Sequence, residues 1–200
     1  MKKYLVLIVL ISSFLWASAQ NDDFKTIFGN KELRISGFGG PIMSFTSLDG
    51  KFAHMMGGGG GIMIGDFFIG GYGMGKTNKT KSSKLSSLGN VDIDFGHGGL
   101  WLGYTFISKK AIHPVVHSMI GWGQISHSPD MGQYAGMIDP VNVFVFIPTV
   151  EMEMNFTKFF KIGIGGNIRL AAFNNSDESN FDAVDLISPG AFMSFKFGWF

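Results

Sequence analysis

Two neighbouring stretches of the chain alternate between apolar and polar side chains, and this pattern limits the possible folds more than any other feature of the sequence. In residues 159–173 the even positions are apolar and the odd positions are polar or small. The apolar set is Phe160, Ile162, Ile164, Ile168, Leu170 and Ala172, and the other set is Lys161, Gly163, Gly165, Asn167, Arg169 and Ala171. Successive side chains on a strand point to opposite sides, so this segment is a strand with one apolar face.

Residues 141–156 repeat the alternation toward their second half, where Glu151 and Glu153 oppose Met152 and Met154. A soluble sandwich buries such an apolar face, whereas a barrel in lipid turns it outward around a polar lumen. The remainder of the chain has to distinguish these two arrangements.

The N-terminal segment has the features of an export signal. Residues 1–19 combine a basic start at Lys2 and Lys3, an apolar core and the small-residue site Ala17-Ser18-Ala19. We therefore expect residues 1–19 to be a signal peptide, residues 20–32 a periplasmic lead-in and residues 33–200 the folded domain. The sequence contains no cysteine, which excludes a lipoprotein anchor, disulfides and thiolate metal sites.

The folded domain divides into eight alternating segments with no credible helix between them. They are residues 33–46, 52–64, 67–76, 91–106, 112–125, 141–156, 159–173 and 188–200. A change of phase at Gly96–Gly99 predicts a bulge in the fourth segment. Connections of about two to five residues alternate, after the first hairpin, with loops of about fourteen, as expected of an outer-membrane barrel with periplasmic turns. We predict an all-β fold, a closed antiparallel up-and-down eight-stranded transmembrane β-barrel.

Aromatic residues gather at the ends of segments that meet short turns, as they would in a girdle at a membrane interface. The predicted girdle is Phe67, Phe68, Tyr104, Phe106, Phe156, Phe159, Phe160, Trp199 and Phe200. The frequency of phenylalanine in strands is a simpler explanation, but the clusters coincide with independently placed turns.

Over residues 33–200 the chain resembles the small OmpA/OmpX-type outer-membrane β-barrels. The resemblance is carried by the signal site, the eight alternating segments and the C-terminal Phe195-Lys196-Phe197-Gly198-Trp199-Phe200. In that family a terminal aromatic residue resembles the signal read by the barrel-insertion machinery. Here Phe200 falls out of the apolar frame of Met193, Phe195, Phe197 and Trp199. The resemblance implies an architecture and names no activity.

Two glycine-rich segments have structural explanations. Residues 70–77 match the phosphate-loop pattern G-x-x-x-x-G-K-[ST], but no helix with an apolar stripe follows, so we reject nucleotide binding. In residues 57–61 we expect inward-facing glycines to relieve crowding, because eight strands leave a lumen that side chains just fill.

Charges of both signs fall on the predicted inward positions. This lumen network comprises Glu151, Glu153, Lys161, Arg169 and Lys196, with Asp92 and Asp94 joining from the fourth segment. Buried charges are costly unless paired, so we interpret the network as a plug, with a narrow ion or proton path as the alternative. His113 and His117 lie about 13 Å apart on a strand, which predicts single lumen histidines and no metal site. We expect no cofactor.

These features favour an integral barrel in the outer membrane of a Gram-negative bacterium, porin-like in form but with a structural or surface-interaction role rather than a wide pore. One alternative is a membrane enzyme that deacylates or acylates lipid A, for which His127 and Ser128 are weak catalytic candidates. Another is a soluble periplasmic β-barrel that binds an apolar ligand. The expected partners are outer-membrane lipid, lipopolysaccharide and the insertion machinery, with the protein a monomer. Lys76, Lys79, Lys81 and Lys84 are candidate contacts for lipopolysaccharide phosphates. A net charge of +1 gives no indication of a nucleic-acid partner.

Overall fold

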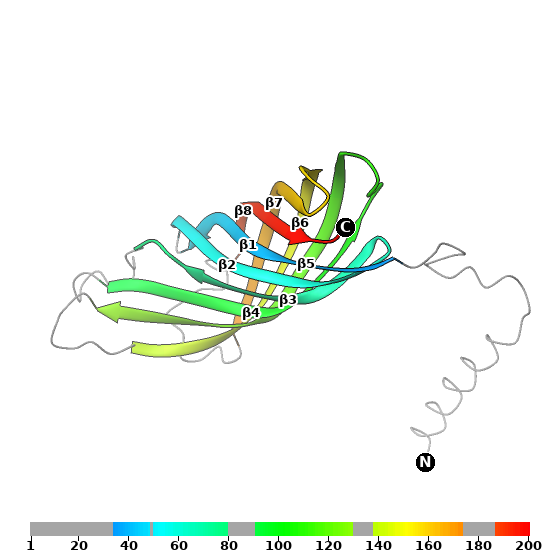
Figure 1. The fold of residues 1–200 in the computed structure, drawn as a ribbon. Coiled ribbons are helices and arrows are strands. Elements are labelled where there is room, and N and C mark those ends of the chain that lie inside the picture. The colour runs from blue at the N-terminus through cyan, green and yellow to red at the C-terminus, as the bar shows by residue number, and fades with distance from the viewer. Residues whose placement is uncertain (1–33, 49, 80–90, 130–137, 174–186) are drawn as a thin grey trace, which may run out of the picture. The chain divides into compact units, whose positions relative to one another are not determined.

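In the computed structural model, eight antiparallel strands pair in chain order and close into a barrel (Figure 1). The strands are β1 (Ile35–Leu48), β2 (Lys51–Ile64), β3 (Phe67–Lys76), β4 (Val91–Thr105), β5 (Ile112–Pro129), β6 (Ile138–Asn155), β7 (Phe160–Phe173) and β8 (Ser188–Gly198). Pairing of β1 with β8 closes the sheet, so none of these strands has an open edge. The structure describes residues 34–48, 50–79, 91–129, 138–173 and 187–200. The predicted closed eight-stranded antiparallel fold is confirmed.

The observed strand ends follow the predicted ones closely, with the largest difference on β5 and β6. Both strands continue beyond the predicted boundary, so only residues 130–137 connect them, fewer than we expected. A shift in register lies between Ile125 and His127 on β5. The bulge predicted at Gly96–Gly99 is wrong, because β4 pairs with β3 and with β5 through those glycines without a shift.

The two faces of the strands separate as the alternation predicted. On β7, Ile164 and Leu170 are 57% and 36% exposed, whereas Lys161 and Arg169 are 4% and 2% exposed. On β7 the large apolar side chains therefore lie on the outside of the barrel, while the charged ones point into its lumen. A soluble barrel would need the opposite orientation, so the structure contradicts that alternative.

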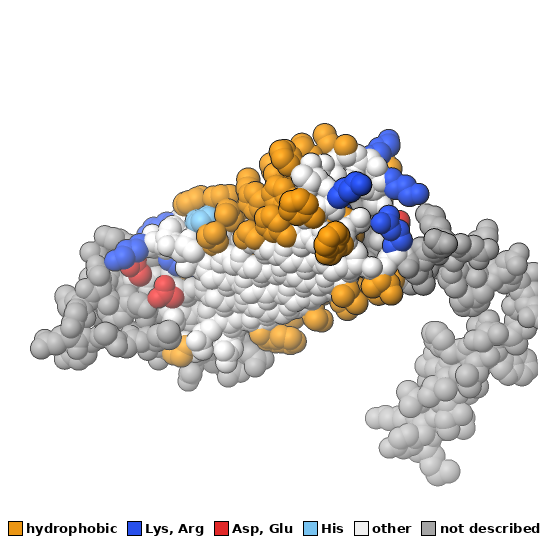
Figure 2. Space-filling model, viewed as in Figure 1, with side chains coloured by type: hydrophobic (Ala, Val, Ile, Leu, Met, Phe, Trp, Pro, Cys, Tyr) orange, Lys and Arg blue, Asp and Glu red, His pale blue; other side chains and the backbone are white. Residues whose placement is uncertain are grey.

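Much of the outer face over β1 to β4 is bare backbone. Figure 2 shows a broad area without hydrophobic side chains there, bordered by hydrophobic ones, and charged side chains toward the two ends of the barrel. Outward-facing glycines produce this surface: Gly58 pairs with Gly73, which pairs with Gly98.

Inward-facing glycines have a steric cause. A Cβ atom on Gly59 would lie 2.8 Å from Cε3 of Trp101, so the indole ring occupies the space that a side chain would need. Within residues 57–61, this position supports the expected relief of crowding.

The predicted signal peptide and lead-in, residues 1–32, lie outside the described residues. Among the residues that are described, no helix is long and apolar enough to cross a membrane.

Candidate functional site

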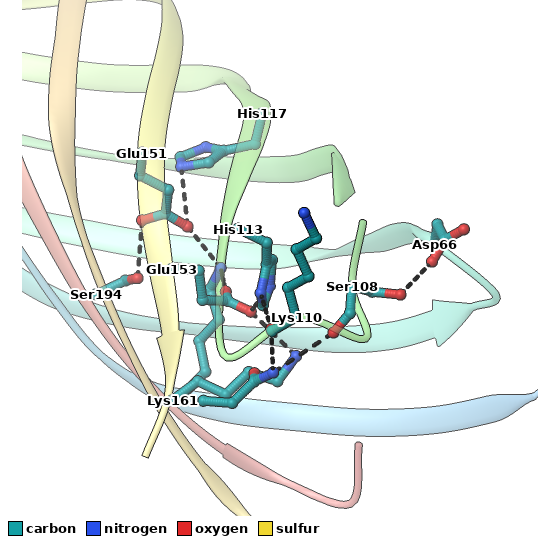
Figure 3. A network of polar contacts seen from close by, with 11 residues as sticks. Asp66, Ser108, Lys110, His113, His117, Glu151, Glu153, Lys161 and Ser194 are labelled. Atoms are coloured by element: carbon teal, nitrogen blue, oxygen red, sulfur yellow. Dashed lines mark hydrogen bonds and ion pairs between the residues drawn. The ribbon is translucent and has the colours of Figure 1, made fainter. Parts of the chain in front are cut away.

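The lumen near the short turns holds a compact ionic cluster of Glu151, Glu153, Lys161 and Lys196, of which Figure 3 labels the first three. The Nζ atom of Lys196 donates to Oε1 of Glu151 and to Oε2 of Glu153, both at 2.6 Å. Lys161 Nζ lies 3.0 Å from Oε1 of Glu153. Two carboxylates and two ammonium groups therefore balance within one layer. The alternation places these residues inward, and the pairing of β6 with β7 and of β7 with β8 brings them to the same level.

Two buried histidines extend the cluster along β5. His113 Nε2 lies 3.1 Å from Oε1 of Glu153, and its Nδ1 lies 2.9 Å from the carbonyl oxygen of Lys110. His117 Nδ1 accepts a hydrogen bond of 3.0 Å from the Trp101 indole, which can only donate. A neutral His117 therefore carries its proton on Nε2, which lies 3.8 Å from Glu151, too far for a hydrogen bond.

Further polar contacts connect the short turns to the cluster. The hydroxyl of Ser108 donates to Asp66 at 2.6 Å, joining the turn after β4 to the turn after β2. Asn155 Nδ2 donates to the carbonyl oxygen of Lys110 at 3.0 Å, and Ser194 donates to Glu151 at 2.9 Å. The short-turn end of the barrel is thus held by hydrogen bonds from its turns into its lumen.

An aromatic layer lies next to the ionic cluster. Phe38, Phe68 and Trp101 meet edge to face, with ring centroids 5.3–5.5 Å apart. The ring of His117 packs against Trp101 and Phe192 at 5.6 and 5.1 Å. Lys196 Nζ lies 5.3 Å from the centroid of Phe68, close enough for a cation–π contact. We define this aromatic layer as Phe38, Phe68, Trp101, His117 and Phe192.

Arg169 is also in the lumen, but it does not join the ionic cluster. Its Nη2 atom donates to the carbonyl oxygen of Ser47 at 2.6 Å, near the long-loop end of β1. A weaker contact of 3.3 Å joins the same atom to the hydroxyl of Ser188. The expected network therefore consists of a four-charge cluster at one end and a separate arginine toward the other.

The predicted participation of Asp92 and Asp94 in the lumen network is wrong. These residues lie on the outward frame of β4, where Asp94 is exposed, and Ile93 and Phe95 point inward instead. An inward position for these acidic side chains would have required a change of phase at the glycines. In the structure a single frame runs along β4, with acidic residues outside at its long-loop end and Leu100, Leu102 and Tyr104 beyond the glycines.

Most of the predicted girdle residues are on the outer surface near the short turns. Exposed members are Phe67, Tyr104, Phe106, Phe156, Phe159 and Trp199, and Phe160 stacks on Phe197 at 4.7 Å. Two assignments are wrong. Phe68 is 1% exposed and belongs to the aromatic layer in the lumen. Phe200 is partly buried, with its ring 4.0 Å from Nζ of Lys161, because the chain leaves the strand after Gly198 and turns inward.

The remaining candidates are dispersed. Lys76 and Lys79 lie at and just beyond the end of β3, while Lys81 and Lys84 fall outside the described residues. His127 and Ser128, expected in a loop, lie within β5, and their side chains are outside the described part. The phosphate-loop match lies on β3 with its last residue just beyond it, which agrees with its rejection. No group of three or more His, Asp or Glu side chains suited to a metal ion occurs in the described ranges.

Sequence reasoning missed several lumen residues, notably Trp101, Tyr72 and Ser194. The alternation of β3, β4 and β8 already indicated that these residues face inward. Aromatic residues such as Trp101 and Tyr72, however, are stable on either face of such a barrel.

The arrangement of the lumen residues can hold a barrel closed. Each charge of the ionic cluster has an opposite charge beside it, and the aromatic layer covers one side of the cluster.

No family model matches the chain, and no curated protein sequence matches it significantly. Solved structures do match. The crystal structure of Neisserial surface protein A, NspA, superposes with a TM-score of 0.58 at 10% identity, over 84% of this chain and 99% of that chain. The attachment invasion locus protein Ail of Yersinia pestis, in complex with the heparin analogue sucrose octasulfate, gives 0.48 at 14% identity over 84% and 100%. The outer membrane protein AlkL gives 0.36 at 11% identity over 90% and 96%. The closed antiparallel barrel and its likeness to NspA establish that this chain has the fold of the small eight-stranded outer-membrane β-barrels.

Proposed function

We propose that the protein is an integral outer-membrane β-barrel with a side-chain-filled lumen, serving envelope structure or surface contact rather than acting as a wide pore. The outer surface supports a membrane location. On β4 the outward frame passes from Asp94 to Tyr104 through glycines and leucines. These ten steps at about 3.3 Å each, tilted by about 40°, span about 25 Å, which is the height of the apolar band of such barrels.

The position of Lys196 is the main observation that argues against a wide pore. Its ammonium group lies between Glu151 and Glu153 and contacts the aromatic layer, and the whole side chain is 5% exposed. Opening a passage here would separate charges that have no access to water, and such separation is costly. A barrel of eight strands has no spare width through which water could bypass these side chains.

Fractionation tests the location. We expect the full-length protein, expressed in a Gram-negative host, to sediment with the outer membrane and to migrate faster on gels before boiling than after. Release into buffer without detergent would contradict the proposal. Arrival in the inner membrane fraction would contradict it as well.

Planar-bilayer recording tests the closed lumen. We expect the purified barrel to show no steady wide-pore current. The double variant Lys196→Ala with Trp101→Ala removes one side chain from the ionic cluster and one from the aromatic layer, so its current should rise above that of the unaltered protein. The variant Val116→Ala, which is altered only on the outer face of the barrel, is the control. Steady large currents from the unaltered protein would contradict a filled lumen.

Contact with lipopolysaccharide belongs to the same proposal. Lys76 and Lys79 stand at the long-loop end of β3, where phosphate groups of lipopolysaccharide would be reached. Replacing Lys76, Lys79, Lys81 and Lys84 by Gln should reduce the stabilisation that lipopolysaccharide gives over phospholipid alone. Lys109→Gln with Lys110→Gln at the opposite end is the matched control, and an equal effect of both sets would reject a specific contact.

A further inference from the structure

Arg169 is a buried cation without a carboxylate partner among the described residues. Its side chain is 2% exposed, and the buried acidic residues in the described part of the chain are Glu151 and Glu153, both engaged in the ionic cluster. The arginine donates to Ser47 and Ser188 through Nη2, and through Nη1 only to the sulfur of Met55 at 3.3 Å. Its Nε atom has no hydrogen-bond partner. Thioether sulfur is a weak acceptor, so much of the donor capacity of this guanidinium group is unused.

His97 is a second unpaired donor near the same place. It is 6% exposed, its Nδ1 lies 3.2 Å from the hydroxyl of Tyr72, and its Nε2 has no partner. When the tyrosine donates to Nδ1, the proton of the neutral ring is on Nε2. The His97 ring lies 5.1 Å from the ring of Phe95, and Cζ of Arg169 lies 5.1 Å from the same ring. Arg169 and His97 therefore both pack against Phe95, and each has a buried nitrogen without a hydrogen-bond partner.

This combination suits an anion. A buried cation without a counter-charge carries a desolvation penalty that neutral acceptors offset only in part. A carboxylate would supply the missing charge, since charge-assisted hydrogen bonds from arginine are among the strongest in proteins. One cation with a neutral imidazole balances a monoanion, whereas a phosphate dianion would leave an uncompensated negative charge.

The position of these residues indicates the direction of access. Ser47 is the second-last residue of β1, and Ser188 is the first of β8, so the guanidinium group is held at the long-loop rim. The aromatic layer and ionic cluster close the other end. We propose that Arg169 and His97 form a binding site for a carboxylate monoanion, reached from the long-loop end of the barrel.

The sequence offers an unusually direct test, because Arg34 and Arg169 are its only arginines. In a nitrogen-15 spectrum of the full-length barrel in detergent micelles, the two Nε–H groups should give two separate signals. Arg34 is exposed at the start of the described chain and serves as an internal control. The probe is sodium acetate, compared with sodium chloride at equal ionic strength and with sodium phosphate.

We expect acetate to shift the Arg169 signal saturably while the Arg34 signal stays in place. Arg169→Gln identifies the responding signal by removing it, and His97→Phe should weaken acetate binding by about tenfold, as for one lost hydrogen bond to a charged group. Heat-modifiable gel mobility verifies that each variant is a folded barrel. Binding unaffected by His97→Phe would remove the imidazole from the site and overturn the proposal as stated.

Three other results would overturn the proposal. Equal shifts at both arginines, or the same response to chloride, would show an ionic-strength effect. Tighter binding of phosphate than of acetate would reject a site for a carboxylate. The Arg169 signal could also fail to respond to acetate until Asp177, Glu178, Asp182 and Asp185 are replaced by amides. This result would show that a carboxylate of the chain itself occupies the position.

Discussion

Buried charges are compensated in different ways at the two ends of the lumen. Near the short turns, Glu151, Glu153, Lys161 and Lys196 balance one another at distances of 2.6–3.0 Å. Near the long loops, Arg169 has only neutral partners and His97 retains an unpaired nitrogen. At the short-turn end His117 also has an unpaired nitrogen, but it lies 3.8 Å from the carboxylate of Glu151. The comparison indicates that closure and stability of the barrel are concentrated at the short-turn end. The other end keeps polar groups that are available for a ligand.

The largest expected effect comes from breaking the balanced end. Lys196→Met removes the ammonium group between Glu151 and Glu153 and leaves two buried carboxylates with less compensation. Loss of one partner of a buried pair typically costs about 3–5 kcal/mol. Urea titration of the barrel in lipid vesicles should show a loss of that size in the free energy of unfolding.

The exposed Lys158, at the turn after β6, provides the control, since Lys158→Met should change stability by less than about 0.5 kcal/mol. The double variant Lys196→Met with Glu151→Gln should recover part of the loss, because it removes one of the uncompensated carboxylates. A loss below about 1 kcal/mol for Lys196→Met would mean that the ionic cluster is not what stabilises this end.

An intermediate effect is expected at the layer between the two ends. A Cβ on Gly59 would lie 2.8 Å from Trp101, so Gly59→Ala has to displace the indole ring from its packing with Phe38 and Phe68. Overpacking of this kind costs about 1–3 kcal/mol. The expected signs are reduced stability in the same urea titration and an altered tryptophan emission.

Gly73 on the neighbouring strand is the matched control, because a Cβ there meets nothing within 4 Å. Gly73→Ala should be close to neutral. If both alanine variants were equally destabilised, the loss would come from the backbone and not from the aromatic layer.

The alternation of apolar and polar positions predicted the strands. The connection lengths and the aromatic clusters were needed as well to predict a closed barrel with its apolar face outward. Lys161 and Glu153 could be placed in the lumen because a charged side chain has no other place within an apolar band. The same rule failed for Asp92 and Asp94, because a strand that extends past the band can carry acidic residues outside. Phe68 and Phe200 were placed wrongly for a related reason, since an aromatic ring is stable both in lipid and in a filled lumen. The partners of Arg169 were beyond sequence reasoning, because they depend on contacts across the barrel.

The smallest expected effect is at the long-loop end and completes the comparison. Arg169→Met, in buffer free of carboxylates, removes a buried cation that leaves no unpaired buried carboxylate behind. The lost hydrogen bonds to Ser47 and Ser188 are offset in part by the smaller desolvation penalty, so we expect a loss of about 1 kcal/mol or less. Addition of acetate should stabilise the unaltered barrel and leave Arg169→Met unchanged, because a ligand stabilises only the state that binds it. If Arg169→Met were as destabilising as Lys196→Met, the two ends would not differ in the way their contacts indicate, and Arg169 would have to be regarded as part of the structural closure of the barrel.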